Sequence, residues 1–384
     1  MGRIHLCGVD VRSSVLRPPP CEPLAFHREL PGYAASPLRE APRLAARLGL
    51  ASVSVKDESS RFGLPAFKIL GASWAIARAL AARCGDPEAR PSSLPALRAL
   101  AASAAPLRLV AATDGNHGRG VARVAGWLGL PATIFVPEGT ARSRIDAIAA
   151  EGAEVVEVAG GYDETVERAA AARGSASLLI QDHAFPGYDE VPRWVIDGYA
   201  TIFWEIEQEW SDFDLVLVQV GVGALAAAAA VHYRRPGLPR RPALASVEPI
   251  GAACALESAA AGRIVTVPAG ARSSIMAGLN CGTPSTVAWP DLARSVDAFV
   301  AVDDERAREA VRALAADGIV SGESGAAGAA GLLELLEGGG AAREWLGLAR
   351  DARVLLLSTE GATDPALWRR IVGRSPEEIR EAAP

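Results

Sequence analysis

Short apolar runs alternate with longer alanine-rich stretches along most of this chain, and this alternation constrains the fold more than any other feature. The apolar runs have the length of buried β-strands, and most end in Gly, Pro, Ser, Thr or Asp; they cover residues 107–113, 131–137, 153–160, 177–182, 215–221, 242–249, 298–302 and 353–359. The stretches with helical spacing cover residues 118–128, 141–150, 163–173, 190–209, 305–317 and 325–336. This order of strands and helices predicts parallel sheets with helices on both faces.

The composition is that of a globular protein with an ample core, since half of the residues are hydrophobic and 22% are charged. A chain of 384 residues is expected to form about two domains. The net charge of -6 gives no basic field for nucleic acid and no polybasic patch for membranes. No apolar run has the length of a signal-peptide core at the start or of a transmembrane helix elsewhere, so we expect a cytoplasmic protein.

Two segments are expected to lie outside the packed elements. Residues 86–106 are rich in Pro and Ala, which is typical of an insertion or a flexible connector, and the polar tail 375–384 is expected to fray. The five cysteines are scattered without a CxxC pair, so the sequence indicates neither a zinc site nor a disulfide scaffold. Cys254 and Cys281 lie in loop-like stretches that could meet, although cytosolic thiols usually stay reduced.

Lysine is rare in this sequence. Of the 39 Lys and Arg residues, two are lysines, Lys56 and Lys68. Arginine supplies charge but cannot do the chemistry of a primary amine. Lys68 follows the turn-like "RFGLPAF" and opens a stretch with helical spacing. The helix dipole disfavours an ammonium group at that end, and a neutral amine can attack an aldehyde to form a Schiff base; the alternative is a surface side chain. Lys56 lies beside Asp57 and Glu58 and is expected to form a surface ion pair.

Three strand ends carry further groups that can bind a ligand. In "VAATDGNHGRGVARVAGWLG" (110–129), Asp114 brings a carboxylate and Asn116 an amide, although an Asx turn that caps a helix would look similar. In "LVLVQVGVGALAAAAA" (215–230), the first N–H groups of the helix form a nest for one phosphate. A dinucleotide is less favoured there because Ala226 stands at the sixth position of GxGxxG. In "RVLLLSTEGATDP" (353–365), the hydroxyl of Ser358 can bond a ring nitrogen, or the segment is an ordinary turn.

Together the four sites suit a single ligand. An amine for an aldehyde, an amide for a ring oxygen, an anion nest for a phosphate and a hydroxyl for a pyridine nitrogen match pyridoxal 5'-phosphate, which stabilises carbanions. No cluster with the spacing of a metal site accompanies them.

The same motifs resemble those of the fold-type II pyridoxal-phosphate enzymes, the tryptophan synthase β family, and within it those of the diaminopropionate ammonia-lyases. The resemblance extends from about residue 25 to about residue 375 and is carried by "KDESSRFGLPAFKILGASWA" (56–75), "ATDGNHGRGVA" (112–122), "GYDETV" (161–166), "GYDEVPRWVIDGYATIFWEI" (187–206), "GVGAL" (221–225), "VEP" (247–249), "SSIMAGLNCGTPS" (273–285), "SGESGAAG" (321–328) and "STEGATDP" (358–365). It implies two open, twisted, mostly parallel sheets flanked by helices, with the cofactor in the cleft between domains. The implied domains are residues 1–75 with 200–384, large and cofactor-binding, and residues 76–199, small.

The resemblance also implies roles for individual residues. Lys68 is the Schiff-base lysine and the base that takes the α-proton of an L-amino acid. The implied cofactor contacts are Phe67 stacked on the ring, Asn116 at the ring oxygen, Gly221, Val222, Gly223, Ala224 and Leu225 at the phosphate, Ser358 (less favoured, Thr359) at the pyridine nitrogen, and Glu323 near the ring.

The implied reaction is α,β-elimination of 2,3-diaminopropionate to pyruvate and ammonia by a homodimer. Asp114 takes the α-proton from a D-amino acid or binds the substrate's β-ammonium. Asp182 is a second candidate for holding that ammonium, and Asp189 is a weaker one.

Departures from the pattern gather around the substrate. His183, Ala184 and Phe185 stand in a loop where this lyase is expected to have Thr and Trp, and Ala362 replaces an expected acidic residue. A serine/threonine dehydratase or a β-replacement synthase acting on a related β-substituted amino acid is therefore the alternative. A nucleotide-binding or regulatory protein is disfavoured, since no acid for a ribose lies between Gly223 and residue 243.

Overall fold

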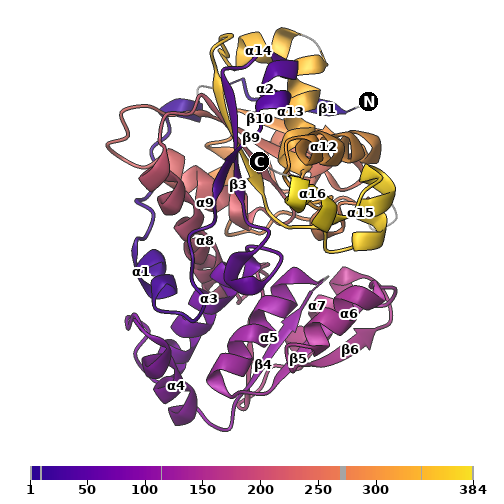
Figure 1. Ribbon diagram of the computed structural model, residues 1–384. Coiled ribbons are helices and arrows are strands. Elements are labelled where there is room, and N and C mark those ends of the chain that lie inside the picture. Colours follow the sequence, from indigo (N-terminus) through magenta and orange to yellow (C-terminus); the bar gives the residue numbers. More distant parts are fainter. Residues whose placement is uncertain (1, 9–10, 114, 269–273, 339, 383–384) are drawn as a thin grey trace. The chain divides into compact units, whose positions relative to one another are not determined.

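The computed structural model describes residues 2–8, 11–113, 115–268, 274–338 and 340–382. They form two compact units. The colours of Figure 1 follow the sequence, so the segments of each unit can be found there by their residue numbers. The first consists of Met1–Pro19, Ala35–Ser60 and Ile202–Pro384, and the second of Pro20–Ala34 and Arg61–Thr201. The structure and the predicted domains therefore divide the chain differently over residues 20–34, 61–75 and 200–201, and the roles attached to the two predicted domains remain predictions.

The first unit contains a seven-stranded sheet in the order β1-β10-β9-β8-β11-β3-β2. Its strands are β1 (Arg3–Leu6), β2 (Leu38–Glu40), β3 (Ser52–Asp57), β8 (Leu215–Gln219), β9 (Ala243–Pro249), β10 (Ala298–Val302) and β11 (Arg353–Ser358). The five central strands are parallel, and the two edge strands, β1 and β2, are antiparallel to their neighbours. Because β8 and β11 are neighbours, the loops that follow them meet at one edge of the sheet.

Helices cover both faces of this sheet, as the apolar strands require. They are α2 (Pro42–Leu48), α9 (Ala224–Tyr233), α10 (Cys254–Ala261), α11 (Trp289–Ala293), α12 (Asp304–Ala316), α13 (Ala327–Glu337), α14 (Gly340–Trp345), α15 (Pro365–Val372) and α16 (Pro376–Ala382). The strand residues Val55, Leu217 and Val300 share a core with Leu332 and Leu333 of α13. The 3-10 turns of this unit are Val11–Ser13, Ile250–Ala252 and Ala277–Leu279.

The second unit contains a four-stranded parallel sheet in the order β6-β5-β4-β7. Its strands are β4 (Arg108–Ala112), β5 (Ala132–Pro137), β6 (Glu154–Val158) and β7 (Ser177–Leu179), and its helices are α1 (Glu22–Arg28), α3 (Lys68–Arg83), α4 (Leu94–Ser103), α5 (Asn116–Leu128), α6 (Arg142–Ala149) and α7 (Tyr162–Ala171), with a 3-10 turn at Arg61–Gly63. Helix α8 (Glu190–Glu209) begins in this unit and ends in the first. Since β4 and β7 are neighbours, the loops after them also meet.

The predicted architecture of mostly parallel sheets flanked by helices is confirmed, but two local predictions are wrong. Residues 86–106 are not an open connector, because they contain α4, whose first turn is capped by the Ser93 hydroxyl and which buries Leu97 and Ala101. The tail likewise forms α16, which buries Ile379. In the described part of the chain, no helix combines the length and the apolar character needed to cross a membrane.

Candidate active site

Lys68 and Asp182 form an ion pair in the second unit, although they lie 114 residues apart in the sequence. The Nζ atom of Lys68 donates to Oδ2 of Asp182 over 2.7 Å, and the side chains are 24% and 6% exposed. Such a contact stabilises the ammonium form of the lysine. This effect is opposite to that of the helix dipole, which disfavours an ammonium group at the start of a helix.

The segment before Lys68 is held in an unusual backbone conformation. Phe62 has φ 53°, a left-handed conformation that a bulky residue rarely adopts. Its carbonyl accepts from Arg123, and its ring packs against Trp127 with centroids 5.8 Å apart. Phe67, the residue just before α3, packs its ring against Tyr199 at 4.7 Å rather than pointing into solvent. These contacts fix where α3 begins, and hence where Lys68 lies.

The Asp182 carboxyl is ionised because of its charged neighbours. Burial alone would raise its pKa, but Lys68, followed by His117 and His183, lowers the pKa well below the usual range. His117, the second residue of α5, is itself buried and its Nε2 lies 2.9 Å from the carbonyl oxygen of Ile180. A carbonyl oxygen can only accept, so Nε2 carries a proton. Sequence reasoning missed His117; its place in the strand-end motif "DGNHG" was the signal that could have indicated it.

Asn116 opens α5 directly after β4, as predicted, and it is half-buried. The turn before it is formed by Thr113, whose Oγ1 accepts from the N–H groups of Gly115 and Gly118. A Cβ on Gly118 would lie 2.3 Å from Cγ2 of Thr113, so only glycine fits there. Asp114 lies outside the described residues.

The predicted phosphate loop, Gly221 to Leu225, connects β8 to α9 in the first unit. Gly223 has φ +98° and precedes the first residue of α9, a left-handed conformation that glycine adopts without strain. A Cβ on Gly221 would lie 3.1 Å from Sγ of Cys281, and the carbonyl of Val222 accepts from the N–H of Ser285. The first N–H groups of a helix have no acceptor within it, so Ala224 and Leu225 can donate to an anion.

The strand end at Ser358 meets the loop that contains Glu323. The hydroxyl of Ser358, which is fully buried, donates to Oγ of Ser321 over 2.8 Å. Glu323 is also buried, two residues further along that loop. Gln219, which sequence reasoning missed, joins the segments because its Nε2 donates to the carbonyls of Gly325 and Leu357. A polar residue at the end of the apolar run "LVLVQ" was the available signal.

Lys56 is not a surface residue, so that prediction is wrong. Its side chain is 0% exposed, its Nζ lies 3.0 Å from Oε2 of Glu205, and it donates to the carbonyl of Ser36. Its partner is therefore a carboxylate from α8, not the adjacent Asp57. The sequence could not show this, because adjacent residues of a strand point to opposite faces.

The structure also places the two cysteines that could have paired and the weaker candidate for binding the β-ammonium group. Cys254 is buried and Cys281 is half-buried, and no disulfide joins the two in the structure. Asp189, the weaker candidate for the β-ammonium, is exposed and lines a surface pocket described below rather than the surroundings of Lys68.

These groups fit pyridoxal phosphate. One partly exposed primary amine stands at a helix start, a glycine loop with a left-handed residue opens a second helix, and a buried hydroxyl ends a parallel strand. Parallel sheets that present these groups at their carboxyl ends define the class of fold-type II pyridoxal-phosphate enzymes.

Comparison with known proteins agrees with this class. The family described as pyridoxal-phosphate dependent enzyme matches residues 30–359. A diaminopropionate ammonia-lyase from Salmonella typhimurium is 37% identical over 373 residues, which cover 92% of either chain. The crystal structure of the selenomethionine-labelled holo diaminopropionate ammonia-lyase from Escherichia coli has a TM-score of 0.85 at 34% identity and covers 97% of this chain and 96% of its own. The structure of that lyase in complex with an aminoacrylate-PLP azomethine reaction intermediate has a TM-score of 0.82 at 32% identity, and 97% of each chain is covered.

The chain belongs to the family of pyridoxal-phosphate-dependent enzymes and, within it, to the diaminopropionate ammonia-lyases. It is therefore a lyase that uses pyridoxal 5'-phosphate as its cofactor.

Proposed function

We propose that this enzyme eliminates ammonia from 2,3-diaminopropionate and yields pyruvate, with both nitrogens of the substrate released as ammonia. The observation that carries the proposal is the ion pair between Lys68 and Asp182, which combines a primary amine with a buried, ionised carboxylate. The reaction needs a group that takes the α-proton and a group that tolerates a cationic leaving amine, and this pair provides both.

The bound cofactor supplies an electron sink for the carbanion formed when the α-proton leaves. In the proposal, Lys68 forms the covalent link to it, the N–H groups of Ala224 and Leu225 bind its phosphate in the loop Gly221-Val222-Gly223, and Ser358 bonds its ring nitrogen. Asn116, Phe67 and Glu323 complete the contacts with the ring.

Lys68 also acts as the base for an L-amino acid substrate. Once its Nζ has taken the α-proton it is an ammonium group, which Asp182 stabilises through the same 2.7 Å contact seen here. The low pKa of Asp182 keeps the carboxylate charged throughout, so it can also hold the β-ammonium of the substrate. Asp114 is proposed to take the α-proton from the D isomer, and Asp114→Asn should then lower turnover of D-diaminopropionate more than that of the L isomer.

The test is pyruvate release from 2,3-diaminopropionate, with serine, threonine and an O-activated serine as competing substrates. We expect the highest kcat/KM with diaminopropionate, and almost complete loss in Lys68→Arg, which keeps the charge but not the primary amine. Arg142→Gln is a control for the loss of a charge, because this exposed side chain lies on α6 and forms an ion pair with Asp146, one turn further along the same helix.

The outcome with the other substrates separates the proposal from its alternative. Pyruvate or a keto acid released faster from serine or threonine would indicate a dehydratase. A new amino acid formed only when a nucleophile is added would indicate a β-replacement synthase. Reduction with borohydride followed by peptide mass spectrometry should place the cofactor on Lys68 in either case.

We further propose that the enzyme is a cytoplasmic homodimer that needs neither nucleic acid nor a membrane. This proposal is supported by the resemblance of its motifs to those of the family, whose members are mostly dimers, and by the net charge of -6. Light scattering coupled to size exclusion tests the dimer, and fractionation of cells that express the chain tests its location.

A further inference from the structure

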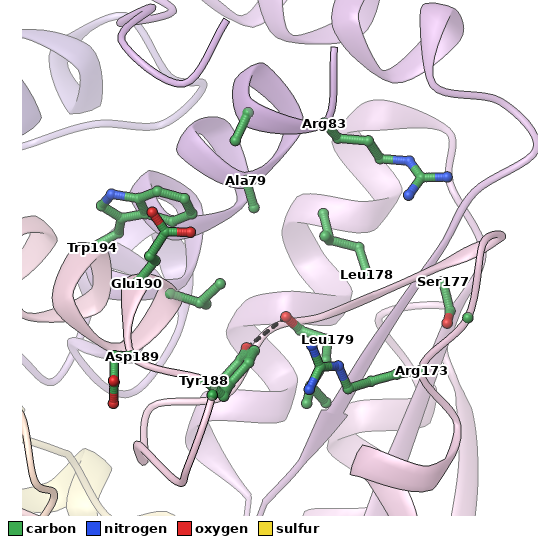
Figure 2. Close-up of a pocket in the computed structure, with 14 residues that line it drawn as sticks. Ala79, Arg83, Arg173, Ser177, Leu178, Leu179, Tyr188, Asp189, Glu190 and Trp194 are labelled. Carbon is green, nitrogen blue, oxygen red and sulfur yellow. Dashed lines mark hydrogen bonds between the residues drawn. The ribbon is translucent and has the colours of Figure 1, made fainter. Parts of the chain in front are cut away.

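The second unit contains a pocket that the proposed reaction does not use. Its volume is about 710 Å³, within the range of ligand sites in proteins. Its walls come from α3, from the segment 173–179 that leads into and forms β7, and from residues 187–194 at the start of α8. Figure 2 shows these side chains around the opening.

Apolar and aromatic side chains form part of the pocket wall. Trp194 is 9% exposed and Tyr188 is 7% exposed, so a small part of each side chain reaches the pocket, beside Ala79 and Leu179. The indole of Trp194 also contacts Arg78, whose guanidinium carbon lies 5.1 Å from the ring centroid. A rigid aromatic surface of this kind suits an apolar or aromatic side chain of a ligand.

The rim carries charges of both signs, separated from each other. Arg83 of α3 and Arg173, which follows α7, lie on one side of the view in Figure 2, and Asp189 and Glu190, at the start of α8, lie on the other. Arg83 donates to the carbonyl of Ser175, and Arg173 lies over the ring of Tyr188 at 5.3 Å. A ligand with a carboxylate at one end and an ammonium group at the other matches this separation.

Tyr188 connects the pocket to the ion pair of the active site. Its ring lines the pocket, while its hydroxyl donates to the carbonyl of Leu179 over 2.6 Å and accepts from the N–H of Gln181 over 3.0 Å. Gln181 directly precedes Asp182, the partner of Lys68. The hydroxyl of Tyr188 is therefore bonded to the backbone of the residue next to Asp182.

We propose that this pocket is a second site for a free amino acid with an apolar or aromatic side chain, and that its occupancy changes the turnover of the enzyme through Tyr188. The carboxylate of the ligand binds on the arginine side, its ammonium group on the side of Asp189 and Glu190, and its side chain against Trp194. The effect on turnover rests on the proposed elimination reaction, whereas the binding does not.

The binding is tested on the holoenzyme without substrate, by calorimetric titration with L-phenylalanine as the probe. We expect saturable binding that Arg83→Gln and Glu190→Gln each weaken about tenfold or more, because each removes a charge-assisted hydrogen bond. Arg142→Gln should bind as the wild type does. Phenylpropionate, which lacks the ammonium group, and phenethylamine, which lacks the carboxylate, should bind at least about tenfold more weakly than phenylalanine.

A separate variant, Tyr188→Phe, tests whether Tyr188 connects the pocket to Asp182. Tyr188→Phe keeps the aromatic wall but removes the bonds to Leu179 and Gln181, so it should still bind phenylalanine while its kcat/KM no longer responds to it. Absence of saturable binding to the wild type, or binding that Arg83→Gln and Glu190→Gln leave unchanged, would overturn the site. A response of Tyr188→Phe equal to that of the wild type would overturn the connection. Binding without any turnover of diaminopropionate would instead count against the proposed reaction alone.

Discussion

The close approach of α3 and α8 at Gly198 gives the sharpest prediction about how the fold holds Lys68. A Cβ added to Gly198 would lie 2.6 Å from the carbonyl oxygen of Leu70 and 2.9 Å from Cα of Gly71. Both atoms belong to the backbone of α3, so no side-chain rotation relieves the overlap. Gly198→Ala therefore pushes apart the helix that begins with Lys68 and the helix that supports it.

The magnitude follows from two opposing effects. Alanine in place of glycine stabilises a helix by up to about 1 kcal/mol, whereas overpacking a tight contact costs about 1–3 kcal/mol. Gly126→Ala in α5 is the matched control, because its added Cβ would meet only the carbonyl oxygen of Glu151 at 3.8 Å. The gain in helix propensity is similar in both variants, so the difference between their free energies of unfolding measures the cost of the steric overlap at Gly198. We expect this difference to be about 3 kcal/mol, the upper end of the range for overpacking.

Urea unfolding followed by tryptophan fluorescence measures this difference, provided that both variants unfold with the same m-value. Displacement of the first turn of α3 also separates Lys68 from Asp182, and a misplacement of about 1 Å can lower a rate about 10²-fold. We therefore expect Gly198→Ala to lose most of its kcat/KM while Gly126→Ala keeps it. Equal stability and equal activity of the two variants would refute the idea that this contact positions the lysine.

Three further predictions concern buried charges. Asp182→Asn should make the free energy of unfolding less dependent on pH in acid. Burial raises the pKa of Asp182, but Lys68 outweighs burial and lowers the pKa in the folded protein. The ionised carboxylate therefore stabilises the wild type above its ordinary pKa of 3.8, and this stabilisation is lost as the pH falls. Glu248 behaves in the opposite way, since burial raises its pKa from 4.5 to about 8. The wild type should therefore lose stability, by about 5 kcal/mol at most, as the pH rises from 4.5 through 8. Urea titrations at several pH values should show this loss in the wild type and not in Glu248→Gln. Lys56→Met should cost about 3–5 kcal/mol because it removes the cation that lies 3.0 Å from the buried carboxylate of Glu205, and addition of Glu205→Leu should restore most of that loss in the same assay. A single variant as stable as the wild type would contradict the importance of that pair.

The regular elements of the fold could be predicted because buried parallel strands are continuous apolar runs. Residues 298–302 and 190–209 match β10 and α8 without any shift at either end. Strand β3 was missed since its run "SVSVKD" includes charged residues, which are buried only because other segments pair with them. Helix α4 was missed because its prolines and small residues resemble a connector, although Ser93 is a good helix cap.

The candidate site was predictable in part. The glycines around Gly223 and the lysine at position 68 show their chemistry in a few neighbouring residues, because positive φ and a primary amine belong to residue types. His117 and Gln219 act through contacts with distant carbonyls, so their part was visible only in the structure.

The sequence by itself determined the class of this protein through the order of strands and helices, the motifs at the strand ends and the lysine that we propose binds the cofactor. Only the tertiary structure decided which carboxylate faces that amine, that Lys56 is buried against Glu205, and that Tyr188 links a surface pocket to Asp182. The reason is physical. Residue types and local spacing set backbone conformation over a few residues, whereas burial and electrostatics depend on segments that folding alone brings together.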